Sequence, residues 1–266
     1  MQRCFSSLGC PELTLDEMFA LATRHGLAAL ELRAVGGTVD VPGWLRSTHG
    51  SPEQAAAHWR SRGTSIRLAA FNTSLHLVGG TPAERDQLLA FVPWAEALGV
   101  RWLRVFDGGR LADAPEIAAA TETLHWWRAE RRRCGWRVDL MIETHDSLWT
   151  AAAIGRLLAA VPDAAILWDS HHTWRKGGED PVATWQAIRR SVVHVHVKDS
   201  VDRPSERHPF TYVLPGDGRF PISPLLAALR ADGFAGPVSL EWERMWHPYL
   251  PPLEVALTTA AARKWW

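Results

Sequence analysis

The sequence predicts an α/β protein with one (β/α)8 TIM barrel domain, and three observations support this. Short runs rich in Val, Ile and Leu alternate with longer helical patterns from end to end, as is typical of repeated βα units around a parallel sheet. Eight such units fit into 266 residues, which gives about 33 residues per unit, the usual size for this barrel. No low-complexity linker divides the chain, so we expect a single domain over residues 1–266.

The first half of the chain carries clear helix start and stop signals. The first helix is expected to begin at Thr14 or Asp16 and to end before Gly26. The third opens with Thr-Pro-Ala-Glu from Thr81 and closes at Gly99, a capping box followed by a C-terminal glycine. The expected elements are strand 3–6, helix 14–25, strand 28–33, helix 52–61, strand 65–71, helix 81–98 and strand 100–106.

The second half repeats the pattern, with one long loop through Pro215-Gly-Asp-Gly218. A doubly wound sheet is the alternative topology. No GxGxxG or GxxxxGK[ST] segment follows any strand, so we expect no nucleotide cofactor. The expected elements are helix 115–134, strand 138–143, helix 148–160, strand 164–169, helix 181–190, strand 192–198, helix 222–232, strand 237–242 and helix 254–263.

Charge and cysteine usage exclude several classes of protein. Lys and Arg together number 29, as do Asp and Glu, and this balance argues against a nucleic-acid binder that works through bulk positive charge. The 3 cysteines show no CxxC spacing, so we expect neither a disulfide framework nor a thiolate zinc site. No segment resembles a secretory signal or a membrane span. We therefore expect a cytoplasmic protein with no membrane or nucleic-acid partner, and a homo-oligomer is compatible with the sequence.

Polar side chains gather where four consecutive barrel strands end. Along segments 138–143, 192–198 and 237–243 the polar residues have the opposite parity to an alternating set of apolar residues, and strand 164–169 ends in Asp169. We therefore expect the polar side chains to face the barrel interior. The residues concerned are Glu143, Asp169, His194, His196, Lys198, Ser239, Glu241 and Glu243. Because the carboxyl ends of the strands carry the active sites of such barrels, this rim is the expected site.

Four of these residues have the composition of a metal site. Taken singly, each has an ordinary interpretation, because acids at strand ends often cap helices and a lone histidine is usually packed. Three carboxylates that converge without a cation would repel one another, so a divalent ion is the natural neutraliser. Three oxygens and one imidazole suit Mn²⁺, Mg²⁺ or Co²⁺ better than a structural zinc. The predicted ligands are Glu143, Asp169, His196 and Glu241.

Six short segments also carry a resemblance to a known family. They are Ala-Leu-Glu-Leu-Arg33, Ile-Glu-Thr-His145, Leu-Trp-Asp-Ser-His-His172, His-Val-His-Val-Lys-Asp199, Leu-Pro-Gly-Asp-Gly218 and Ser-Leu-Glu-Trp-Glu243. Over nearly the whole chain the sequence resembles the sugar phosphate isomerase/epimerase family of xylose isomerase-like TIM barrels.

The resemblance implies roles for several residues. It makes Glu143, Asp169, His196 and Glu241 the metal ligands, places His172 in contact with substrate, and makes Glu143 and Glu241 an acid/base pair around an enediolate intermediate. Mn²⁺ is the ion we expect first, with Mg²⁺, Co²⁺ and Zn²⁺ as alternatives.

Other rim residues have two interpretations each. Lys198 would either hold a substrate oxygen or anionic group, and so join the catalytic residues, or pair with Asp199 or Glu241. Glu31 and Arg33 would bind substrate hydroxyls or form a structural ion pair. The remaining predicted substrate contacts are His76, His145 and Glu243, of which Glu243 is also the reserve metal ligand. His194 is expected to be structural, and segment 202–212 either covers the substrate or is a solvated loop.

The leading functional hypothesis is a metal-dependent isomerase or epimerase of a sugar, sugar phosphate or related polyhydroxy carbonyl compound, a small carbohydrate-like molecule. The alternative is a lyase on the same scaffold that dehydrates an inosose, dehydroshikimate or a keto-glycoside. An abasic-site endonuclease would need ligands for three zinc ions, where this chain has only Asp107 and the segment Glu206-Arg207-His208. A non-catalytic barrel is the fourth hypothesis.

Overall fold

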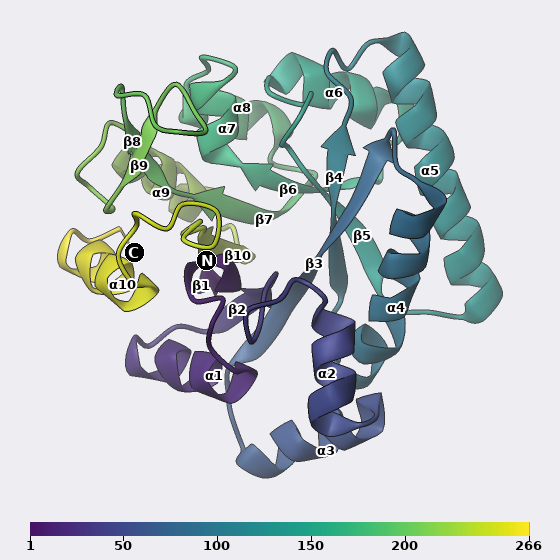
Figure 1. Ribbon diagram of the computed structural model, residues 1–266. Coiled ribbons are helices and arrows are strands. Elements are labelled where there is room, and N and C mark those ends of the chain that lie inside the picture. The colour runs from purple at the N-terminus through teal and green to yellow at the C-terminus, as the bar shows by residue number, and fades with distance from the viewer. Residues whose placement is uncertain (266) are drawn as a thin grey trace.

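The strands close into a parallel barrel in the computed structural model, which describes residues 1–265 (Figure 1). Around the barrel the order is β1-β10-β7-β6-β5-β4-β3-β2, so each βα unit lies beside the next and the last strand pairs with the first. The predicted (β/α)8 barrel is confirmed. Its strands are β1 (Gln2–Ser6), β2 (Ala29–Leu32), β3 (Arg67–Val78), β4 (Trp102–Gly108), β5 (Asp139–Glu143), β6 (Ala165–Asp169), β7 (Val192–Val197) and β10 (Pro237–Leu240).

Helices surround the barrel (Figure 1), and several begin as the sequence predicts. Thr14 and Thr81 each form a capping box, and Gly99 ends its helix in the left-handed conformation. No helix among residues 1–265 is long and apolar enough to cross a membrane. The helices are α1 (Leu15–Arg24), α2 (Val41–His49), α3 (Pro52–Arg62), α4 (Pro82–Leu98), α5 (Ala114–Cys134), α6 (Ala151–Ala160), α7 (Ser170–Arg175), α8 (Pro181–Ile188), α9 (Ile222–Ala231) and α10 (Leu253–Ala262).

The two faces of each strand have different surroundings. Outward residues such as Phe5, Leu30 and Val195 join the helices in one large apolar core. The inward positions form two small separate clusters low in the barrel, one of which is Ala70, Met141 and Leu167. Met141 and Leu167 precede Glu143 and Asp169 by two residues, so alternation along the strand places the two acids on the same interior face, nearer the carboxyl end.

The structure adds four features that the periodic pattern did not predict. Helix α2 contains Pro42 and Gly43, residues typical of turns, and it is capped by Asp40. Helix α7 has only 6 residues and starts directly after β6. Strands β8 (Asp199–Val201) and β9 (Thr211–Val213) form a hairpin in the expected long loop, with most of segment 202–212 as its connection. Strand β3 continues to Val78, past a register shift relative to β4.

Candidate metal centre

The four predicted metal ligands converge at the carboxyl end of the barrel. Glu143 and Asp169 end β5 and β6, His196 lies near the end of β7, and Glu241 directly follows β10. One donor atom from each lies within 4.8 Å of the others, and all four residues are buried. The structure therefore brings together on neighbouring strands the residues that the parity of the sequence selected.

The free atoms of this cluster fit a divalent cation. His196 Nδ1 is buried and has no hydrogen-bond partner among residues 1–265, and the buried Glu143 Oε2 lies 3.1 Å from the Nε of Arg104. His196 Nδ1 lies 3.3 Å from Glu241 Oε2 and 3.7 Å from Glu143 Oε1. A buried polar atom without a partner is costly, and a cation bound between His196 Nδ1 and these carboxylates would satisfy it. The set of three carboxylates and one imidazole would hold such an ion.

Lys198 is the fixed cation of the cluster. Its Nζ lies 2.8 Å from Asp169 Oδ2, 2.5 Å from Glu241 Oε2 and 2.7 Å from Glu243 Oε1. Burial lowers the pKa of Lys198, but the carboxylates of Asp169, Glu241 and Glu243 outweigh this and raise the pKa well above its ordinary value. Of the pairings considered for Lys198, the structure therefore shows the one with Glu241.

Asp199, unlike Lys198, binds the backbone of a neighbouring loop. Its carboxylate accepts hydrogen bonds from the backbone amides of Gly216, Gly218 and Phe220. A Cβ at Gly218 would lie 2.1 Å from Asp199 Oδ1, so the close approach requires glycine at this position. The Pro215-Gly-Asp-Gly218 segment is thus a loop whose backbone is hydrogen-bonded to Asp199, the residue that follows Lys198.

The acids of the cluster titrate differently. Burial raises the pKa of Asp169 to about 6, and Lys198 offsets this only in part. Burial also raises the pKa of Glu143, but the charge of Arg104 and the contact with His196 together outweigh it and hold the pKa below the usual range. Burial lowers the pKa of His196, and the carboxylates of Glu241 and Glu31 reverse this and raise it well above its ordinary value.

A cavity of about 80 Å³ opens beside the cluster. Among the predicted substrate contacts, Arg33, His145, His172 and Glu243 line it, together with Lys198, Glu143 and Glu241. Leu8, Phe106 and Trp246 supply apolar parts of the wall. Glu31 and His76 do not line the cavity.

Arg104 is a cavity residue that the sequence analysis missed. Its side chain is 2% exposed, its Nε lies 3.1 Å from Glu143 Oε2, and its guanidinium donates to the carbonyl of Thr73. The guanidinium carbon also lies 4.0 Å from the centroid of the Phe106 ring. The sequence does contain a signal for it, because a charged residue between Leu103 and Val105 in a buried strand is expected to face the barrel interior.

The histidines near the cavity are held by specific partners. His172 Nδ1 lies 3.0 Å from the carbonyl oxygen of Thr144 and must donate to it, so Nε2 is the nitrogen that can accept a proton. Burial and the charge of Lys198 lower the pKa of His172 well below its ordinary value. His145 Nδ1 lies 2.7 Å from Asp146 Oδ1. His76 contacts Glu84 and stacks on the face of Phe106.

Asp107 orders the loop that carries His145. Its carboxylate accepts hydrogen bonds from the backbone amides of His145, Asp146, Ser147 and Leu148. The sequence analysis weighed Asp107 only as a ligand in a nuclease. The structure gives it a loop-positioning contact at the end of β4.

A model of one protein family matches residues 19–265, and the family is described as the xylose isomerase-like TIM barrel. The chain belongs to this family. This match confirms, at the level of the family, the resemblance noted in the sequence. A search of curated proteins gives no match.

Several solved structures share the fold of this chain at low sequence identity. A probable 3-DHS dehydratase, AsbF from Bacillus anthracis, superposes with a TM-score of 0.78 at 16% identity, over 98% of this chain and 99% of that one. The IOLI protein with a bound zinc atom has a TM-score of 0.74 at 19% identity, over 99% and 96%. D-psicose 3-epimerase from Clostridium cellulolyticum, solved with D-tagatose, has 0.68 at 15%, over 99% and 97%. The likeness shows the fold, and two of these proteins are named as a probable dehydratase and an epimerase.

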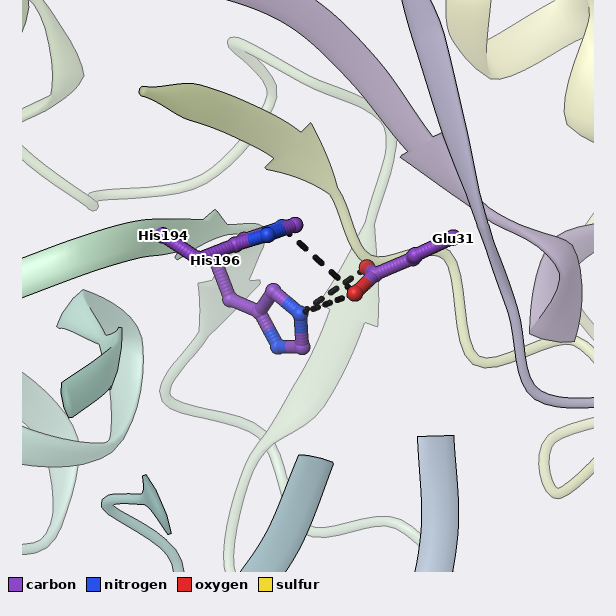
Figure 2. A group of neighbouring side chains, drawn as sticks. All are labelled: Glu31, His194 and His196. Carbon is purple, nitrogen blue, oxygen red and sulfur yellow. Dashed lines mark hydrogen bonds and ion pairs between the residues drawn. The ribbon is translucent and has the colours of Figure 1, made fainter. Parts of the chain in front are cut away.

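In this xylose isomerase-like barrel, Glu31 contacts one member of the four-residue cluster, His196. Figure 2 shows its carboxylate directed at His196, with His194 beside them. Glu31 is fully buried, and it contacts His196 Nε2 at 2.9 Å. Arg33 does not pair with it but donates to the carbonyl of Asn72. The expected ion pair between Glu31 and Arg33 is therefore not formed, and a role of Glu31 in binding substrate hydroxyls stays a prediction.

Proposed function

We propose that the protein is a divalent-metal-dependent isomerase or epimerase that removes a proton next to the carbonyl of a sugar, sugar phosphate or related polyhydroxy compound. The observation that carries this proposal is the set of four buried donors on neighbouring strands, two of which, Glu143 and Glu241, line a small polar cavity. A bound ion supplies Lewis-acid polarisation of the substrate carbonyl. Mn²⁺ is the proposed ion, and Mg²⁺, Co²⁺ and Zn²⁺ are its competitors.

Glu143 and Glu241 are the proposed acid/base pair. Glu143 comes from β5 and Glu241 from the end of β10, with β6 and β7 between these strands, so the two carboxylates reach the cavity from different sides. Arg104 lies beside the first and Lys198 beside the second. These cations keep both carboxylates ionised. One ionised carboxylate can take the proton from carbon on its own face, and the other, once it has been protonated from solvent, can deliver a proton to the opposite face.

A lyase is the second candidate, because the cavity wall is rich in buried cations. Arg33, Arg104 and Lys198 all line it. Such a wall suits a substrate that carries a carboxylate. The charged Lys198 could then donate a proton to a departing hydroxyl, while neutral His172 accepts one through Nε2. The probable 3-DHS dehydratase among the structural neighbours makes dehydroshikimate the first lyase substrate to test.

Substrate turnover in deuterated water separates the two reactions. The Mn²⁺-loaded protein is incubated with a panel of ketoses, inososes and 3-dehydroshikimate and followed by NMR. Deuterium incorporation at a carbon beside the carbonyl, without loss of water, identifies an isomerase or epimerase. An unsaturated or aromatic product identifies a lyase.

Two variants control this experiment. Glu241→Gln is expected to abolish either reaction, whereas Glu122→Gln, an exposed change on α5, should leave it intact. A wild-type chain that binds no divalent ion would contradict the proposal.

A further inference from the structure

The two ring nitrogens of His196 face different partners, and Figure 2 shows the contact between one of them and Glu31. Nε2 lies 2.9 Å from Glu31 Oε1 and 3.1 Å from Glu31 Oε2. Nδ1 has no hydrogen-bond partner among residues 1–265, and it faces the carboxylates of Glu143 and Glu241. Because an ionised carboxylate only accepts, Nε2 must carry the hydrogen, and Nδ1 is the nitrogen whose lone pair can bind a metal.

Glu31 is itself fixed from several strands. Ser239 Oγ on β10 donates to its Oε1 at 2.6 Å, and Asn72 Nδ2 on β3 donates to its Oε2 at 3.1 Å. Glu31 lies on β2, which is separated from β7 by β1 and β10, so its side chain spans the barrel interior to reach His196. A fully buried carboxylate held by three donors has little freedom, and it imposes its orientation on the imidazole.

We propose that Glu31 is a positioning residue that holds His196 with Nε2 protonated and Nδ1 directed at the metal centre. This inference rests on the metal centre of the proposed function. A carboxylate on the far nitrogen of a ligand histidine fixes the ring and increases its basicity. Glu31 would therefore act on metal affinity through His196 without touching substrate.

The same residues also form a second cluster of donors, Glu31, His194 and His196. Two features favour a hydrogen-bonded support over a second metal ion there. His196 Nε2 would have to lose its hydrogen to bind an ion, and both Glu31 oxygens already accept from Ser239 and Asn72. His194 Nε2 is farther away, at 3.5 Å from Glu31.

The test compares metal binding by Glu31→Gln, Glu31→Asp and Ser239→Ala. In Glu31→Gln an amide NH₂ can face Nε2, which favours the tautomer with hydrogen on Nδ1. We expect this variant to bind Zn²⁺ or Mn²⁺ about 10- to 100-fold more weakly in competition with a chelator. Glu31→Asp keeps the carboxylate and should recover part of the loss. Ser239→Ala removes one donor to Glu31 but keeps the Glu31–His196 contact, so it should weaken binding less than Glu31→Gln does. Glu122→Gln, the same change at an exposed position on α5, is the matched control.

A second measurement reports on the ring itself. In ¹⁵N NMR spectra of the Zn²⁺-loaded wild type, His196 should show a protonated Nε2 and a metal-bound Nδ1, and Glu31→Gln should lose this signature. A folded Glu31→Gln with wild-type affinity would overturn the positioning role alone. Two ions per chain, with the second lost in both Glu31→Gln and His194→Gln, would overturn it in favour of a second metal site. A wild type that binds no ion would instead defeat the proposed metal centre.

Discussion

Lys198 lies between Asp169 and Glu241, with its Nζ 2.8 Å from Asp169 Oδ2 and 2.5 Å from Glu241 Oε2. Two of the four proposed ligands therefore share a fixed positive charge before any ion binds. The ammonium relieves the repulsion between the carboxylates, and the same charge opposes the entry of a divalent cation. Glu243, 2.7 Å from Nζ, offers Lys198 a third carboxylate outside the ligand set.

Lys198→Met should separate these effects. Without the ammonium, the metal-free protein keeps buried carboxylates that lack their partner, and we expect its free energy of unfolding to fall by about 3–5 kcal/mol. The affinity for Mn²⁺ should rise by about tenfold or more, because a repulsive charge is gone. Chelator competition and denaturant unfolding, with and without Mn²⁺, measure both, and exposed Lys264→Met is the control. Weaker Mn²⁺ binding in Lys198→Met would contradict this account.

Metal binding should weaken as the pH falls. The pKa of His196 is raised well above its ordinary value and that of Asp169 is raised to about 6, so an incoming ion must displace a proton from each group that is still protonated. Near pH 7.5 His196 is the only one of these two groups that still holds a proton to be displaced. The logarithm of the association constant should therefore rise by about one for each unit of pH. Below about pH 6 Asp169 adds a second proton, and the slope should approach about two. Calorimetry in buffers of different ionisation enthalpy counts the protons, and a pH-independent affinity would refute the assignment.

Strand parity predicted most of the barrel and of the ligand cluster, because it is a local property of each strand. Val193, Val195 and Val197 alternate with His194, His196 and Lys198, and this alternation alone directs the polar side chains inward. The link between Glu31 and His196 was not predictable in the same way. It joins β2 to β7 across the barrel, and no periodicity encodes which interior side chains meet.

Short elements escaped prediction for a different reason. Helix α7 starts at Ser170, where Asp169 serves both as the last residue of β6 and as the cap of the helix. One residue thus belongs to two elements, and the pattern shows only the strand. The hairpin of β8 and β9 is similarly hidden, since its strands have only 3 residues each.

Arg104→Met should destabilise the metal-free protein more than the metal-loaded one. The change leaves Glu143, which is 1% exposed, without its neighbouring cation, and the loss of one partner from a buried pair costs about 3–5 kcal/mol. A bound divalent ion would supply positive charge to Glu143 and reduce that cost. Thermal unfolding with and without Mn²⁺ measures the difference. Exposed Arg110→Met is the control, and an equal loss in both states would show that Arg104 acts only through packing.

Two glycine substitutions should have opposite effects. A Cβ at Gly218 would lie 2.1 Å from Asp199 Oδ1 and 2.6 Å from the carbonyl oxygen of Ser200. Gly218→Ala should therefore lower the free energy of unfolding by about 1–3 kcal/mol. It should also lower kcat/KM, because the displaced loop is hydrogen-bonded to Asp199, the neighbour of Lys198 in the sequence. Gly155 lies within α6, and a Cβ there meets no described atom within 4 Å, so Gly155→Ala should stabilise the protein by about 0.5–1 kcal/mol with unchanged activity. Denaturant unfolding and steady-state kinetics test both, and a Gly218→Ala protein with wild-type stability would show that the loop can move away from Asp199 without cost.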